Sequence, residues 1–208
     1  MKTKLYLDQL PLWPSTGRHI LAQYDEQSIY VYQAYRPAIA DYAVKNQCFG
    51  GEFSYSRMSW IKTNFLWMMY RSGWATKVGQ ERILAIKLKR HFFNEILNNV
   101  VPSTFDETKY ESQKSWQVAV ANSEIRLQWD PDHDPTGRRV ARRAVQIGLR
   151  GNALCRYGQS ELLAIEDITS FVNEQRANIV GDMSNLFTVE EHVYYPGEEA
   201  AIAIKLNE

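Results

Sequence analysis

The run from Arg57 to Trp74 constrains this chain more than any other stretch, because it combines large aromatic side chains with fixed positive charges. It reads RMSWIKTNFLWMMYRSGW and holds half of the chain's 6 tryptophans. Trp60, Trp67 and Trp74 are evenly spaced, and that spacing places them on one face of a helix but on alternating faces of a strand. The spacing alone therefore leaves the secondary structure of the run open.

The same run allows two interpretations of its purpose. Rings beside cations suit a pocket for a flat, anionic ligand such as a nucleotide, where rings stack on the base and guanidinium groups bind phosphate. Aromatic residues and methionine also commonly serve a hydrophobic core. Arg57, Lys62 and Arg71 are costly to bury without partners, which speaks for the pocket. Both interpretations stay open at this point.

Composition limits the wider possibilities. A length of 208 residues favours one domain (1–208), with 45% hydrophobic and 23% charged residues as in ordinary globular proteins. Lys+Arg and Asp+Glu both number 24, so net charge does not favour non-specific attraction to nucleic acid or to an anionic membrane. An anion site must therefore be local.

No apolar run approaches the length of a membrane span, and the N-terminal residues lack the apolar core of a signal peptide. Cys48 and Cys155 lie far apart and outside any CxxC spacing, which argues against a disulfide framework or a zinc site. We therefore expect a cytoplasmic protein without a membrane partner.

Hydrophobic periodicity predicts the elements. We expect strands at 28–35, 82–88, 115–121, 124–130 and 144–149, with a hairpin at 122–123 joining the third and fourth. We expect helices at 37–45, 90–100 and 160–179, a surface loop at 103–113, and a closing hairpin formed by 192–196 and 201–206. Residues 1–18, with two prolines and a glycine, predict an extended arm packed on the domain.

These elements predict a single α+β domain whose sheet is mixed or mostly antiparallel and has flanking helices. A regular βαβ rhythm is missing, and so are GxGxxG after the first strand and GxxxxGK[ST]. Dinucleotide binding of the Rossmann type and P-loop chemistry are therefore not indicated.

The segment Asp130–Gly137, DPDHDPTG, raises the question of a metal site. An EF-hand loop starting at Asp130 would need glycine at Pro135 and glutamate at Ala141, so the calcium interpretation fails. A tight turn, with aspartate side chains accepting from backbone amides, explains the sequence better. We predict no metal, and we expect Gln128 and Asp130 to be delivered to a loop at the end of a strand.

Nucleophilic catalysis has little support in the sequence. Neither cysteine has a neighbouring base, and neither Ser56 nor Ser59 lies in a GxSxG turn. Basic residues from Arg138 to Arg143 could form a phosphate-binding rim with Arg57 and Arg71. The alternative is a solvated face balanced by nearby acids.

Several ordered motifs resemble one family, the domain of unknown function 4291 family. They are VYQAY (31–35), RMSWIKTNFLWMMYRSGW (57–74), QERILAI (80–86), QWDPDHD (128–134) and VQIGLRG (145–151), and the resemblance covers 24–169. It implies a recurring set: Gln33, Tyr35, Arg57, Trp60, Lys62, Trp67, Tyr70, Arg71, Trp74, Gln80, Gln128, Asp130 and Gln146. The chain departs from the pattern with His133 in place of arginine and Thr63 in place of proline.

A fold-level analogy links this order of elements to ADP-ribosyltransferases, which hold NAD in a cleft lined by polar and aromatic residues. Gln33 would stand where that fold has histidine or arginine, and Asp130 or Glu81 where it has glutamate. The expected function is therefore an enzyme with a nucleotide-like ligand, NAD being the candidate cofactor and ADP-ribosyl transfer the leading reaction. A nucleic-acid-processing enzyme and a protein-interaction module are the alternatives, and the oligomeric state stays open.

The expected site follows from these arguments. We predict catalytic roles for Gln33, Tyr35, Gln128 and Asp130. We predict ligand binding by Arg57, Trp60, Lys62, Trp67, Tyr70, Arg71, Trp74, Gln80, Arg143 and Gln146.

Overall fold

A computed structural model describes residues 1–207 of the chain. The strands are β1 (Thr3–Leu5), β2 (Gly17–Arg18), β3 (Ile20–Ala22), β4 (Ser28–Tyr35), β5 (Ser59–Lys62), β6 (Arg82–Lys89), β7 (Val101–Pro102), β8 (Ile125–His133), β9 (Arg139–Leu149), β10 (Leu162–Asp167), β11 (Phe187–Val189) and β12 (His192–Tyr194). The helices are α1 (Tyr6–Gln9), a 3-10 turn (Leu10–Leu12), α2 (Pro37–Asn46), α3 (Phe65–Ser72), α4 (Arg90–Asn98), α5 (Gln113–Asn122), α6 (Gly151–Gln159), α7 (Thr169–Ala177) and α8 (Glu198–Ala203).

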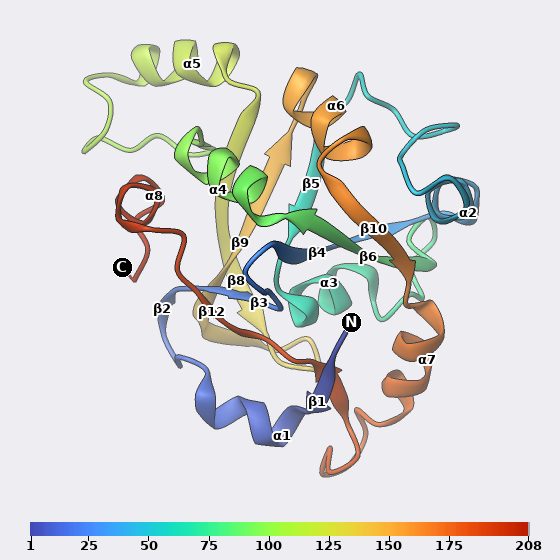
Figure 1. Ribbon diagram of the computed structural model, residues 1–208. Helices are drawn as coiled ribbons and strands as arrows, with labels where there is room; N and C mark the ends of the chain where they lie inside the picture. Colours follow the sequence, from blue (N-terminus) through green and yellow to red (C-terminus); the bar gives the residue numbers. More distant parts are fainter. Residues whose placement is uncertain (208) are drawn as a thin grey trace.

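One large sheet organises these elements (Figure 1). Its strand order is β10-β6-β4-β5-β9-β8-β7, and β2 pairs with β9 off this path. The β7–β8 and β2–β9 pairs are parallel and the others are antiparallel. Two small antiparallel pairs, β1–β11 and β3–β12, join the beginning of the chain to its end. The predicted α+β fold with a mixed, mostly antiparallel sheet and flanking helices is confirmed.

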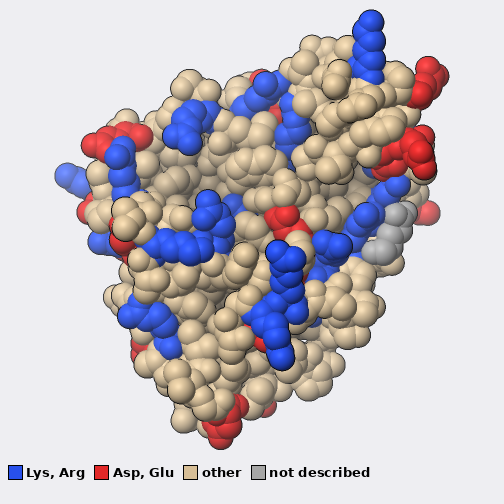
Figure 2. All heavy atoms as spheres, turned by 180° about the vertical axis from the view of Figure 1, so that it is seen from behind, with Lys and Arg blue, Asp and Glu red and all other residues tan. Residues whose placement is uncertain are grey.

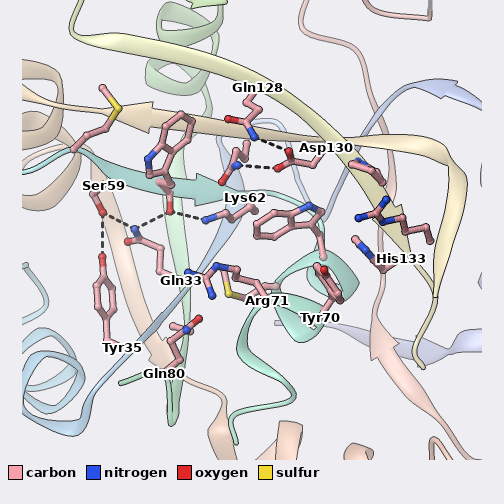
Figure 3. Close-up of a pocket in the computed structure, with 18 of the residues that line it drawn as sticks. Gln33, Tyr35, Ser59, Lys62, Tyr70, Arg71, Gln80, Gln128, Asp130 and His133 are labelled. Carbon is pink, nitrogen blue, oxygen red and sulfur yellow. Dashed lines mark hydrogen bonds between the residues drawn. The ribbon is translucent and has the colours of Figure 1, made fainter. Parts of the chain in front are cut away.

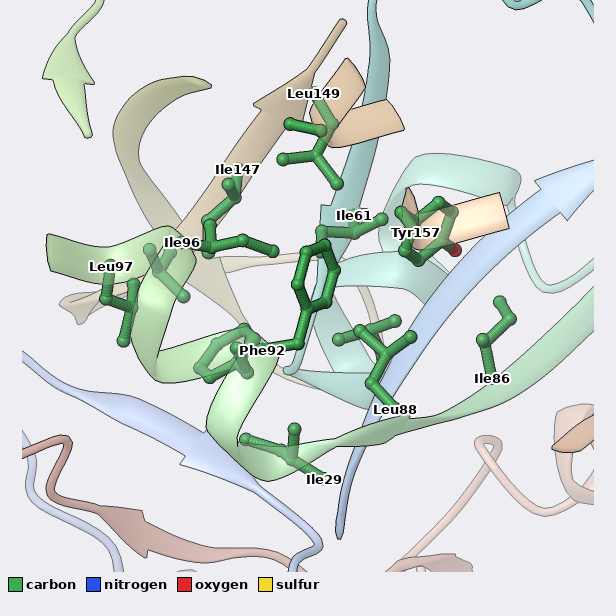
Figure 4. Packing of buried hydrophobic residues seen from close by; sticks show 14 of the residues in the cluster. Ile29, Ile61, Ile86, Leu88, Phe92, Ile96, Leu97, Ile147, Leu149 and Tyr157 are labelled. Atoms are coloured by element: carbon green, nitrogen blue, oxygen red, sulfur yellow. The ribbon is translucent and has the colours of Figure 1, made fainter. Parts of the chain in front are cut away.

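Helices cover both faces of the sheet because its central strands are apolar on both sides. On β4, Ile29 and Val31 belong to a core that includes Phe92 of α4 and Tyr157 of α6 (Figure 4). The alternate residue Tyr32 faces the opposite core, which is built with α3, α7 and the N-terminal segment. A strand alternates its side chains between faces, so one segment supplies both cores.

Several elements match their predicted positions. The strands predicted at 28–35 and 82–88 are β4 and β6, and those at 124–130 and 144–149 form parts of β8 and β9. The helices predicted at 37–45 and 90–100 are α2 and α4. Each of these segments combines a clear hydrophobic period with a definite start or stop signal.

The strand predicted at 115–121 is wrong, because that segment is helix α5, and the hairpin at 122–123 is wrong with it. Ser112 and Ser115 form a reciprocal capping box that starts the helix. No residue of α5 is buried, and the helix projects from the edge of the molecule in Figure 1. The apolar residues of 115–121 alternate as in a strand, but in the helix they form no buried face.

The long helix predicted at 160–179 is also wrong, since the segment divides into β10 and α7. Asp167 ends the strand and accepts hydrogen bonds from the backbone and hydroxyl of Thr169 (2.9 Å and 2.5 Å), which starts the helix. The predicted closing hairpin fails because β12 pairs with β3 and residues 198–203 form α8. Helix α6 was not predicted at all.

Residues 1–18 are not extended throughout, since they include α1 and the 3-10 turn. They do pack on the domain, with Tyr6 and Trp13 buried in the core on the α3 side. No helix within residues 1–207 is long and apolar enough to cross a membrane. Both cysteines are free thiols.

Candidate functional site

The sheet splits between β4 and β5, and the candidate site lies at this split. The two strands are paired only at Tyr32 and Lys62, after which β4 continues along β6 and β5 along β9. The Gln33 side chain bridges the divergence, donating from Nε2 to Ser59 Oγ (2.8 Å) and to the Trp60 carbonyl (3.1 Å). Its Oε1 accepts from the hydroxyl of Tyr157 (2.6 Å). The amide of Gln33, a predicted catalytic residue, therefore links the diverging part of β4 to β5 and to α6.

A pocket of about 790 Å³ lies at this split, between α3 and the ends of β4, β5, β8 and β9 (Figure 3). Most of the predicted site residues line it: Gln33, Tyr35, Arg57, Trp60, Lys62, Trp67, Tyr70, Arg71, Gln80, Gln128, Asp130 and Gln146. Further lining comes from Arg139, which belongs to the proposed phosphate-binding rim, and from residues that were not predicted: Ala34, Met58, Ser59, Met68, Pro131 and His133. Residues separated by over a hundred positions in sequence thus face one cavity.

Positive charge dominates the lining. Arg57, Lys62, Arg71 and Arg139 face the pocket with one carboxylate, Asp130. Within residues 1–207 none of these four cations has a carboxylate oxygen within salt-bridge distance, whereas Arg138 and Arg142, on either side of Arg139 in the sequence, do. Figure 2 shows the face opposite that of Figure 1, where Lys and Arg side chains gather around its hollowed centre. Cations without acid partners are suited to bind an anion from solution.

Lys62 is the most unusual of these groups because it is buried at 7% exposure. Its Nζ donates to the Trp60 carbonyl (3.2 Å) and lies 4.8 Å from the centre of the Trp67 ring. Burial and the nearby charge of Arg71 lower the pKa of Lys62 to about 7, against an opposing effect of Asp130. A substantial fraction of this amine is therefore neutral at neutral pH.

Asp130 is held by two glutamine side chains. Gln128 donates to Oδ1 and Gln146 donates to Oδ2, both at 2.7 Å. Gln128 and Gln146 are cross-strand partners on β8 and β9, and Asp130 follows Gln128 on the same face two residues later. The three side chains form one rigid unit on the floor of the pocket, so the two glutamines position the carboxylate.

His133 and Tyr70 close one end of the pocket with a parallel ring stack, their centres 3.5 Å apart. His133 is buried at 3% exposure, and this burial lowers its pKa, which favours the neutral imidazole. Within the described chain neither ring nitrogen has a hydrogen-bond partner. A buried polar group without a partner is uncommon, and a ligand or water in the pocket would satisfy it.

Tyr35 lies at the opposite end of the pocket. Its hydroxyl is 3.2 Å from Ser59 Oγ, and burial of the phenol raises its pKa well above the ordinary value. The phenol is therefore a neutral hydrogen-bonding group rather than a base at neutral pH.

Trp60 lies against Gly148, its cross-strand partner on β9. A Cβ atom at Gly148 would come within 3.1 Å of the indole and 2.7 Å of Met58 Sδ. We expect Gly148→Ala to displace both side chains and to lower the free energy of unfolding by about 1–3 kcal/mol. Urea denaturation monitored by tryptophan fluorescence measures both effects. An unchanged midpoint and spectrum would show that this contact does not position Trp60.

Two residues predicted to bind ligand lie outside the pocket. Trp74 is buried in the core behind α3, where its Nε1 donates to the Pro135 carbonyl (3.1 Å) and fixes the β8–β9 turn. Arg143 is exposed on β9, opposite Arg18 of β2. Glu81, the alternative carboxylate of the analogy, does not line the pocket either, and its Oε1 accepts from the Gly79 backbone (2.8 Å).

The segment 57–74 is therefore both pocket and core. Trp60 is on strand β5, Trp67 is on helix α3, and Trp74 follows the helix with a left-handed backbone (φ 54°). The regular spacing of the tryptophans crosses three kinds of local structure, so neither periodic interpretation applies.

Two side-chain oxygens accept hydrogen bonds from the first turn of α3, the helix that forms this wall of the pocket. Asn64 accepts from the Trp67 backbone N–H (2.6 Å), and Glu191 accepts from that of Phe65 (2.7 Å). Glu191 is fully buried, and its pKa is raised by that burial. The end of the chain thereby fixes the position of the helix that carries Tyr70 and Arg71.

Fold and site define the class of protein: an α+β protein with a cationic, aromatic pocket set into a split sheet. The chain belongs to the family described as "Domain of unknown function (DUF4291)", whose model matches residues 19–194. A comparison with curated proteins found no match.

Proposed function

We propose that the protein is an enzyme that binds a nucleotide-like anionic ligand in this pocket. The observation that carries the proposal is the set of four cations without acid partners, which surrounds one positioned carboxylate and several aromatic rings. Arginine offers bidentate hydrogen bonds to phosphate, and an indole or phenol offers a stacking surface for a base. The volume of about 790 Å³ lies within the range of small-molecule sites.

NAD is the first candidate ligand, and ADP-ribosyl transfer is the first candidate reaction. Arg57, Arg71 and Arg139 would bind the phosphates, and Trp60 would stack on a ring of the dinucleotide. Asp130 would face the ribose and stabilise positive charge that develops when the bond to nicotinamide breaks. The proposal draws on the fold-level analogy and on the donor set of the pocket.

A nucleic-acid-processing enzyme is the second candidate, favoured by two observations. Arg139 is exposed at the pocket, where it could bind a longer phosphate backbone, and Lys62 supplies an amine that is partly neutral. The protein-interaction alternative fits less well, because partner-binding surfaces of that kind are exposed apolar patches rather than concave polar cavities.

A thermal-shift screen with NAD, ATP, AMP and the matching unphosphorylated nucleosides tests the proposal. A ligand at about 100 times its dissociation constant should stabilise the folded state by about 2.7 kcal/mol. We expect phosphorylated compounds to raise the melting temperature more than their nucleosides, and the difference to shrink at high salt. No shift with any nucleotide would contradict the proposal.

Arg71→Met separates ligand binding from folding. Arg71 has no carboxylate partner within residues 1–207, so its loss strands no buried charge. We expect a stability within about 1 kcal/mol of the wild type and a loss of the nucleotide shift. Arg143→Met, on the outer part of β9, is the matched control and should keep the shift. Equal responses of the two variants would remove Arg71 from the ligand site.

A further inference from the structure

The Lys62 side chain combines three properties that distinguish it from an ordinary phosphate-binding lysine. It is buried, it lines the pocket, and its Nζ has only the Trp60 carbonyl and the Trp67 ring as described partners. Burial and Arg71 together favour its neutral form. A neutral amine has a free electron pair and can attack an electrophile, as in enzymes that place a lysine next to another cation.

The site itself indicates which electrophile would meet this amine. Arg71 lies close enough to Lys62 for its charge to lower the lysine pKa, and both side chains face the same cavity (Figure 3). A phosphate bound by Arg71 would therefore lie beside Lys62 Nζ. Arg57 and Arg139 add positive charge, which stabilises the charge on phosphate oxygens during substitution at phosphorus.

Asp130 is the carboxylate among the described residues that line the pocket, and its charge acts on Lys62. Its two oxygens already accept from Gln128 and Gln146, so the carboxylate is positioned but partly occupied. It lies on the same face of the sheet as Lys62, whose cross-strand partner is Gln146. Its charge opposes the effect of Arg71 and favours the protonated amine, so the attack uses the neutral fraction that burial and Arg71 maintain.

We propose that Lys62 is a nucleophile that accepts a nucleotidyl group from a bound nucleoside triphosphate or dinucleotide. Nζ forms a bond to the α-phosphorus of ATP, or to the adenylate phosphorus of NAD. The bond from that phosphorus to the bridging oxygen breaks. Pyrophosphate or nicotinamide mononucleotide leaves with the electron pair, and the amine releases one proton to solvent. The product is a phosphoramidate on Lys62, from which a hydroxyl or phosphate acceptor could take the nucleotide.

This inference rests on the proposed nucleotide binding, and it names the bond that is attacked. It differs from ADP-ribosyl transfer, in which the bond to nicotinamide breaks and the pyrophosphate stays intact. Intact-mass spectrometry distinguishes the two, because one adduct carries AMP and the other carries ADP-ribose.

The test incubates the full chain with ATP or with NAD in the presence of Mg²⁺, which accompanies polyphosphates. Intact mass is measured at neutral and alkaline pH before and after mild acid, because a phosphoramidate is acid-labile. Peptide mass spectrometry then locates the modified residue. We expect an acid-labile AMP adduct on Lys62 and release of pyrophosphate from ATP or of nicotinamide mononucleotide from NAD.

Two variants serve as comparison. Lys62→Met should form no adduct. Lys77→Met changes an exposed lysine that does not line the pocket and whose Nζ donates to the backbone carbonyls of Tyr70 and Arg71. This variant should form the adduct like the wild type. Location of the adduct on wild-type protein does not depend on the folding of either variant.

The outcomes separate this inference from the proposed function. A nucleotide shift without any adduct overturns the covalent step and leaves nucleotide binding in place. An ADP-ribose adduct, or an AMP adduct on another residue, also overturns it. The absence of both a thermal shift and an adduct contradicts both proposals.

Discussion

Lys62→Met is expected to make the protein more stable, by roughly 3–5 kcal/mol at pH 6. The unfolded chain has a lysine pKa near 10.5, whereas burial lowers the folded value to about 7. At pH 6 the folded protein must hold a buried ammonium group next to Arg71, and methionine removes that cost. The hydrogen bond lost is a small one, because the Trp60 carbonyl also accepts from Gln33.

The pH dependence gives the sign of this effect. Between about pH 7 and 10.5 the unfolded chain holds a proton on Lys62 that the folded chain has released. Stability of the wild type should therefore rise with pH across that interval, and Lys62→Met should lack this contribution. Urea denaturation of both proteins at pH 6, 8 and 9.5 measures it. A variant less stable than the wild type at all three values would show that the amine stabilises the fold.

Arg142→Met is expected to destabilise the protein by about 3–5 kcal/mol, which is a large part of the stability of a typical domain. Arg142 donates to Asp132 Oδ2 from two nitrogens (2.8 Å and 2.6 Å) and to the Pro14 carbonyl (2.6 Å). Both side chains are buried, so removal of the arginine leaves an unpaired carboxylate whose pKa burial already raises.

The contrast with Arg71→Met makes this a matched test. The substitution is the same, but only Arg142 has a buried carboxylate partner among the described residues. The double variant Arg142→Met, Asp132→Asn should recover part of the loss, because the stranded charge is gone. The urea midpoints of the three variants measure these differences in stability. Equal midpoints for Arg71→Met and Arg142→Met would contradict the division into pocket and structural arginines.

Much of the site could be predicted because β4, β5, β8 and β9 obey strand alternation. Gln33 and Tyr35 share a face as expected, although the Gln33 amide is hydrogen-bonded to Ser59 and Trp60 of β5. Gln128 and Asp130 stay adjacent for the same reason. The split of the sheet could not be predicted, since it depends on which strands pair, and pairing is set by contacts distant in sequence.

Two predicted site residues lie outside the pocket for identifiable reasons. Trp74 was predicted to bind ligand because it lies in the aromatic and basic run 57–74, but the chain turns at Gly73 (φ 59°) and the indole is buried in the core. Arg143 was grouped with its neighbours by charge, yet it lies exposed on the part of β9 that pairs with Arg18 of β2. His133 showed no signal beyond its position next to a predicted strand end, and only the fold brings it against Tyr70.

The errors in the fold arise where local pattern and tertiary packing disagree. The alternating residues 115–121 form an exposed helix, since a capping box fixes its start and no sheet edge receives it. Residues 160–179 have apolar side chains throughout, and the strand within them is recognised only through its partner β6. Periodicity identifies apolar faces, but not the element against which they pack.

Isothermal titration calorimetry of NAD and ATP into the wild type, Arg71→Met and Arg143→Met tests the central claim most directly. The claim is that unpaired cations around Lys62 and Asp130 bind the phosphates of a nucleotide. We expect saturable binding by the wild type and by Arg143→Met, weakened by added salt, and a loss of at least about tenfold in affinity for Arg71→Met, equivalent to about 1.4 kcal/mol. Absence of saturable heat for both nucleotides with the folded wild type, or unchanged affinity in Arg71→Met, would contradict it.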